Sequence, residues 1–239
     1  MSTINQSAVI ENKHMNIRQQ TTTKEGNMTI KASKLIRWAG LSALIAGISY
    51  IFVGILHPAN VLSSAITTEW EIAHIFAIAM SFFGIYGMTG LYVKQAEKSG
   101  GLGLVGFVMF SLWLAIVMCF SFIEAFILPQ LATIAPMYVD GFMGIFTSTT
   151  SEIDFGILPT LWTLSAPLYM FGGLLFGIAT FRAGILSRWA GVVFAIGTMM
   201  APVAAMLPAD YQSIVTIPVG VGLAWLGYAL WSGRQEHAQ

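Results

Sequence analysis

The stretch that decides the fold is residues 38–57, WAGLSALIAGISYIFVGILH, in which no Asp, Glu, Lys or Arg occurs. The hydrocarbon core of a bilayer is about 30 Å thick and takes roughly 20 apolar residues of α-helix. The run meets this length. It also lacks the short alternation of polar and apolar residues that is typical of membrane barrel strands. It therefore predicts a transmembrane helix.

Five further stretches have similar length and composition. The chain of 239 residues is 56% hydrophobic and only 9% charged, whereas soluble domains carry about 25% charged residues. So few charges cannot cover a water-facing surface, and lipid must be the solvent for most of the chain. We predict an all-α membrane protein, a six-transmembrane-helix bundle, with spans at about 35–57, 71–93, 102–128, 157–181, 187–207 and 211–232.

The two ends of the chain are polar. Residues 1–30 are rich in Thr, Asn and Gln, and no apolar core follows a charged start there as it would in a cleaved signal peptide. We expect residues 1–30 to be a disordered cytoplasmic tail. Residues 31–233 then form the transmembrane domain, and residues 234–239 form a cytoplasmic C-terminal tail.

Positive charge occurs on only one side of this topology, and acidic residues dominate the other three loops. Lys and Arg are enriched in cytoplasmic loops, so we predict a multi-pass protein of the plasma (inner) membrane with both termini cytoplasmic. The overall pattern resembles that of small bacterial membrane proteins, without indicating a family. The basic residues are Lys13, Arg18, Lys24, Lys31, Lys34, Arg37, Lys94, Lys98, Arg182, Arg188 and Arg234.

Recurring motifs indicate three copies of a two-helix hairpin. Arg-Trp-Ala-Gly opens the spans at residues 37–40 and 188–191, and the three outward-running spans end before Pro58, Pro129 and Pro208. Such copies would be related by an axis along the membrane normal. The alternative is that Gly-rich membrane helices are similar because they share a composition.

Small and aromatic residues suggest how the helices pack. Gly40, Gly47 and Gly54 form one stripe of the first span, where small side chains let two helices approach closely. The long outer loop from Pro129 to Asp154 is rich in apolar residues and is expected to fold back onto the helix ends. Trp70, Tyr138 and Trp162 fit an aromatic belt at the outer membrane surface.

Three ionisable residues are exceptions within the apolar spans. When the hairpins are aligned, His57, His74 and Glu124 each occupy a position that is not ionised in the two sister copies, and all three lie near the outer end. Charges in lipid are costly and usually face the bundle interior, where they find partners. We predict that these residues converge on an outward-facing polar pocket. Glu71, three residues before His74, is expected to orient its imidazole.

The cluster has two chemical interpretations. Two imidazoles and a carboxylate can ligate a divalent metal that keeps one position open, although the sequence leaves the cofactor unknown. They can also relay a proton. Structural roles remain as alternatives: a helix end at the interface for His57, a hydrogen bond to a backbone carbonyl for His74, and a bond to a neighbouring helix for Glu124.

These features favour a binding or transport-related membrane protein. The alternatives are a metal-dependent membrane enzyme that uses His57, His74 and Glu124, and a structural or regulatory subunit without a site of its own. We expect the lipid bilayer, and other membrane subunits, as partners. Nucleic acid is not expected, because no basic cluster is present. A single cysteine, Cys119, excludes an internal disulfide and a Cys-based metal motif.

Overall fold

The computed structural model describes residues 32–233, so the predicted tails, residues 1–30 and 234–239, lie outside the described residues. The chain divides into two compact units, Met1–Leu35 and Ile36–Gln239, and the contacts given below all lie within the second. All regular elements of the described residues are helical. They are α2 (Ala32–Leu56), η1 (Ser64–Ile66), α3 (Thr68–Phe126), α4 (Leu128–Ile134), α5 (Pro136–Thr147), α6 (Leu158–Ala183), α7 (Arg188–Thr198), α8 (Ala201–Ala204), η2 (Ala209–Thr216) and α9 (Ile217–Ser232).

Four segments of the described chain are helical, long and apolar enough to cross a membrane: Ser33–Leu56, Thr68–Phe126, Leu158–Ala183 and Ala209–Ser232. Large apolar side chains are also exposed along these helices, such as Phe82, which is 62% exposed. Water would not tolerate so much apolar surface, whereas lipid does. These features indicate a membrane-embedded helical protein. The count of spans differs from the six predicted, for two reasons that lie in α3 and α7.

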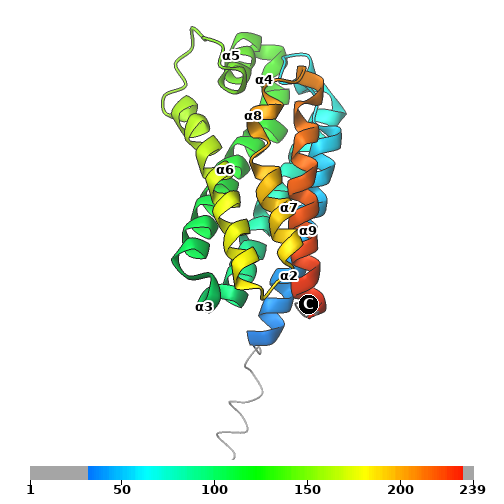
Figure 1. The fold of residues 1–239 in the computed structure, drawn as a ribbon. Coiled ribbons are helices and arrows are strands. Elements are labelled where there is room, and N and C mark those ends of the chain that lie inside the picture. The colour runs from blue at the N-terminus through cyan, green and yellow to red at the C-terminus, as the bar shows by residue number, and fades with distance from the viewer. Residues whose placement is uncertain (1–31, 234–239) are drawn as a thin grey trace, which may run out of the picture. The chain divides into compact units, whose positions relative to one another are not determined.

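The first reason is that α3 contains two predicted spans. At Gly100 the backbone leaves the helical conformation, with φ 56° and ψ −152°. A straight helix would separate His74 and Glu124, 50 positions apart, by about 75 Å, yet their side chains lie 3.4 Å apart. Figure 1 shows α3 running from the end of the bundle where α5 lies to the opposite end and back. We call its two halves α3 before Gly100 and α3 after Gly100.

The second reason is that the fifth predicted span is broken. α7 has 11 residues and α8 has four, so neither alone reaches the roughly 20 residues that a span takes. The amides of Met199 and Met200 bond to carbonyls only three residues back, which tightens the last turn. Pro202 follows at the start of α8 and cannot donate to a continuing helix. Eight residues of 3-10 helix, η2, then precede α9.

The reversal at Gly100 provides a direct test of the fold. Its φ and ψ belong to a region that is essentially restricted to glycine, and no atom lies within 4 Å of a Cβ built there. Gly100→Ala is therefore expected to lower the free energy of unfolding by about 1–3 kcal/mol through backbone conformation alone. Denaturant titration of the purified protein in detergent measures this change. Gly101→Ala, at an equally open position without positive φ, is the control and should not destabilise the protein. Equal stability of the two variants would show that the backbone conformation at Gly100 does not require glycine.

Glycines mark where the helices touch. The predicted stripe of Gly40, Gly47 and Gly54 is confirmed as a packing surface, since a Cβ at each would collide with α9 or its start. Corresponding close approaches join every pair of neighbouring segments into a closed ring. They are Gly87 with Ala43 (α3 and α2), Gly84 with Leu114 (the two halves of α3), Gly106 with Phe176 (α3 and α6), Gly177 with Gly191 (α6 and α7) and Gly222 with Phe194 (α9 and α7).

The middle of this ring is filled by aromatic side chains. Trp113 contacts Tyr169 at 4.6 Å and Phe110 at 4.9 Å between ring centroids, and Phe110 contacts Phe194 at 4.9 Å. Tyr50 packs on the other side of Trp113. Because these rings are buried, the interior is a packed core rather than an open channel.

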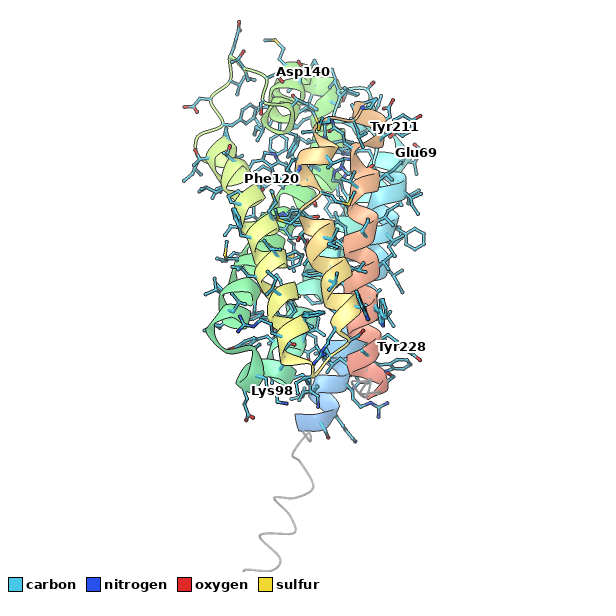
Figure 2. The ribbon with its side chains drawn as sticks, viewed as in Figure 1. Glu69, Lys98, Phe120, Asp140, Tyr211 and Tyr228 are labelled. Carbon is cyan, nitrogen blue, oxygen red and sulfur yellow. The ribbon has the colours of Figure 1, made fainter. Side chains whose placement is uncertain are left out.

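The loop after α3 folds back over one end of the bundle, as predicted. Val139, Phe142 and Met143 of α5 are buried in one cluster with Trp70 and Phe120 of α3. Figure 2 shows Glu69 and Asp140 at this end and Lys98 at the opposite end, which agrees with the charge separation seen in the sequence. We call the end that carries α4 and α5 the capped end.

Candidate functional site

The core of the candidate site is a buried pair formed by His74 and Glu124. Nε2 of His74 lies 3.4 Å from Oε2 of Glu124, and their side chains are only 1% and 7% exposed. His74 comes from α3 before Gly100 and Glu124 from α3 after it, so the hairpin at Gly100 brings the pair together. The predicted convergence of these two residues is thus present in the structure.

Local capping positions the histidine. The Thr67 hydroxyl accepts a hydrogen bond from the Trp70 backbone amide at 3.2 Å and begins α3, a typical N-cap. Glu69 and Glu71 in the first turn complement the positive end of the helix. With the start of the helix defined in this way, Trp70 and His74 fall one turn apart on the same inward face.

Trp70 holds the pair in place. Its indole Nε1 donates to the backbone carbonyl of Glu124 at 2.8 Å, and its ring lies 4.2 Å from that of His74. Trp70 is completely buried, so its prediction as part of a surface aromatic belt was wrong. A buried tryptophan needs a partner for its N–H, and the carbonyl of Glu124 supplies one. Its spacing of four residues from His74 was the signal available in the sequence.

The hydrogen bonds decide which nitrogen of His74 carries a proton. Nδ1 lies 2.7 Å from the Trp70 carbonyl oxygen, which can only accept, so Nδ1 is the donor. Nε2 has no hydrogen-bond partner among the described residues, although the Glu124 carboxyl lies beside it. A lone pair facing a carboxylate would be repulsive. A proton on Nε2 or on the carboxyl of Glu124 makes this contact attractive.

His57 continues this cluster toward the surface of the capped end. It is the first residue after α2, and its ring lies 4.8 Å from His74 and 5.7 Å from Trp70. Its Nδ1 donates to the Pro58 carbonyl at 2.7 Å. Burial, and then the neighbouring His74, lower the pKa of His57 to about 4. His57 is thus a neutral imidazole at neutral pH.

Glu71 does not have the predicted role. It is exposed, and the partner that orients Nδ1 of His74 is the Trp70 carbonyl. The reason is geometric: a helical histidine reaches the carbonyl one turn back, whereas Glu71 in the first turn extends into solvent. The carbonyl bond that was the structural alternative for His74 is therefore present, together with the contact to Glu124.

The metal interpretation lacks geometric support. Within residues 32–233, no group of three His, Cys, Asp or Glu side chains is arranged to hold a metal ion. Both Nδ1 atoms of His57 and His74 are engaged by backbone carbonyls. The cluster of His57, His74 and Glu124 is better suited to holding and passing a proton, since each member can gain or lose one.

A pocket of about 590 Å³ adjoins this cluster, and His57 forms part of its wall. Another part of the wall comes from the turn after α8 and from η2, where the fifth and sixth predicted spans are not α-helical. Non-helical backbone in a membrane protein is tolerated where it lines a water-filled cavity. The lining residues are Val53, His57, Pro58, Ala59, Asn60, Val61, Phe146, Thr147, Ser148, Ala205, Ala209, Gln212, Ser213 and Thr216.

Most of this wall was not recognised in the sequence. His57, His74 and Glu124 stand out because they are ionisable within apolar spans. Asn60, Gln212, Ser213 and Thr216 are uncharged, and the last three fall within the predicted span 211–232. The polar residues Gln212, Ser213 and Thr216 between Pro208 and Pro218 were the available signal.

Comparisons of the chain with protein-family models, with curated proteins and with solved structures found no match.

Proposed function

We propose that the chain is a multi-pass membrane protein of the binding or transport-related type. In this proposal a small ligand enters the pocket beside His57 from the outer side of the membrane, and His57 connects the ligand site to the buried pair of His74 and Glu124. The observation that carries the proposal is the continuity of the pocket wall with the buried pair: His57 borders the pocket and lies 4.8 Å from His74.

The broken helices support a ligand site at this place. Secondary transporters often bind substrate where discontinuous helices leave backbone groups free to contact it. α8 and η2 are such segments, and residues of both the turn after α8 and η2 line the pocket. The aromatic core around Trp113 lies in the bundle interior, so any passage of ligand through the protein requires these rings to move.

The proposal includes the topology inferred from charge. Six crossings, made of α2, the two halves of α3, α6, the α7–α8 segment and η2–α9, would put both termini in the cytoplasm and the capped end outside, in the plasma membrane. Such a chain would have the bilayer, and other membrane subunits, as partners. The three-hairpin repeat belongs to the same proposal; it is supported by the ring of neighbours but is weakened by the short α7.

Labelling of single cysteines tests the outward-facing pocket. In a Cys119→Ser background, Ser213→Cys places a thiol in the pocket wall, and Lys98→Cys places one at the opposite end. A membrane-impermeant thiol reagent applied to intact cells is expected to label Ser213→Cys, because the pocket is open to the outside. Mass analysis of the purified variants measures the labelled fraction.

The Lys98→Cys variant is the matched control. It is expected to react only after the cells are opened, since the basic end is predicted to face the cytoplasm. Labelling of Lys98→Cys in intact cells, or protection of Ser213→Cys there, would overturn the orientation and with it the proposed site.

A further inference from the structure

The walls of the pocket beside His57 carry no formal charge. None of its lining residues is Asp, Glu, Lys or Arg, and the single titratable group, His57, is neutral because its pKa is lowered to about 4. An ion that loses water in such a site finds no opposite charge to compensate for the desolvation. The wall therefore disfavours both anionic and cationic ligands relative to neutral ones.

Several side-chain donors of the wall are used within the protein. The Thr216 hydroxyl donates to the Ser213 carbonyl at 2.7 Å, and the Ser213 hydroxyl donates to the His57 carbonyl at 3.4 Å. Nε2 of Gln212 donates to the Leu207 carbonyl at 3.2 Å. Nδ1 of His57 is engaged by Pro58 in the same way. Each bond turns a hydrogen toward the backbone and away from the pocket.

Acceptor atoms of these residues remain for a ligand. Because Nε2 of Gln212 points at a carbonyl, its Oε1 is an acceptor, and the hydroxyl oxygens of Ser213 and Thr216 retain lone pairs. The amide nitrogen of Asn60 and the hydroxyl of Ser148 are donors in the same wall. A ligand whose groups both donate and accept hydrogen bonds is therefore favoured.

The remaining wall is apolar. Val53, Pro58, Val61 and Phe146 present carbon surface between the polar groups. The volume of about 590 Å³ falls within the range of about 300–1,000 Å³ that is usual for small-molecule sites. A compact molecule with both hydroxyl groups and C–H surface matches this mixture of acceptors and apolar atoms.

We infer that the pocket beside His57 binds an uncharged polyhydroxyl compound through a polar wall without formal charge. This inference rests on the proposed outward-facing binding function and names the class of its ligand. No chemical change of the ligand is implied. The hydroxyl groups form hydrogen bonds with Gln212 and with the hydroxyl groups of the wall, and the C–H faces pack on the apolar side chains.

Binding of matched probes tests the ligand class. The full-length protein in lipid nanodiscs is titrated calorimetrically with glucose and the smaller xylitol, and with glucuronate and glucosamine as anionic and cationic counterparts of glucose. At least one neutral polyol is expected to bind about tenfold or more tightly than either charged compound. Equal or tighter binding of glucuronate or glucosamine overturns the inference, as does the absence of binding by both polyols.

Two glutamines provide a matched pair of variants. Gln212→Ala removes a pocket acceptor and should weaken polyol binding about 2- to 10-fold, which corresponds to one hydrogen bond. Gln130 on α4 also donates to a backbone carbonyl, that of Phe126, but it does not line the pocket, so Gln130→Ala should leave binding unchanged. Equal effects of the two variants would place the polyol elsewhere and overturn the inference.

The labelling and binding experiments distinguish a wrong ligand class from a wrong function. If Ser213→Cys is labelled from outside while neither polyol binds, the ligand class is wrong and the outward-facing pocket stands. If Ser213→Cys is protected in intact cells, the proposed function itself fails.

Discussion

Replacing His74 with leucine is expected to lower the free energy of unfolding by about 3–5 kcal/mol, because Glu124 is then buried without its partner. Glu124 is only 6% exposed, so water cannot replace the imidazole. The double variant His74→Leu/Glu124→Leu removes both polar groups and should recover most of this loss. Denaturant titration in detergent measures His74→Leu, Glu124→Leu and the double variant beside the unmodified protein. A double variant that is as unstable as the sum of two single changes would contradict a coupled pair.

Glu124→Gln separates the charge of the carboxyl from its hydrogen-bonding role. Its amide can donate to Nε2 of His74, so the free energy of unfolding should stay within about 1 kcal/mol of the unmodified value. Denaturant titration in detergent measures this change. A loss as large as that of His74→Leu would show that the amide cannot replace the carboxyl in this contact.

The second large effect is expected at the contact between α2 and α9. A Cβ on Gly47 would lie 2.5 Å from the Gly220 carbonyl oxygen and 2.7 Å from Cα of Ala224. Both are backbone atoms that cannot rotate away, so Gly47→Leu must push the two helices apart. We expect a loss of about 3 kcal/mol or more in the free energy of unfolding, measured by denaturant titration in detergent.

A neighbouring position on the same helix is the control for this change. Ile48 is 44% exposed, on the face of α2 that is open to lipid, and Ile48→Val should change the free energy of unfolding by less than about 0.5 kcal/mol. If Gly47→Leu were tolerated equally well, the stripe of Gly40, Gly47 and Gly54 would not be a packing surface.

Local composition was sufficient to predict the helical, membrane-embedded class and part of the packing. The absence of charge in residues 38–57 requires a lipid environment whatever the fold, and the seven-residue spacing of Gly40, Gly47 and Gly54 defines one face of a helix. The candidate pair was also found from the sequence, because His74 and Glu124 are ionisable residues in apolar runs and need partners wherever the chain places them.

Contacts between distant segments were not available from local patterns. Trp70 looks like an interfacial tryptophan in the sequence, and only its bond to the Glu124 carbonyl shows that it belongs to the site. Glu71 shares a helical face with His74 by spacing, but the Trp70 carbonyl lies closer to Nδ1. The end of α7 at Thr198, shortly before Pro202, is a local break that hydropathy averaged over a whole span does not resolve.

The sequence by itself determined that this protein lies in lipid and that its apolar segments are helical. It also determined which ionisable residues need a partner when they are buried. These properties follow from transfer free energies and hydrogen-bonding needs that each segment has alone. Only the tertiary structure decided that Trp70 bonds to Glu124 across the hairpin and that an uncharged pocket opens beside His57. Both depend on residues far apart in the sequence, and their positions are set by how closely the glycine faces let the helices approach.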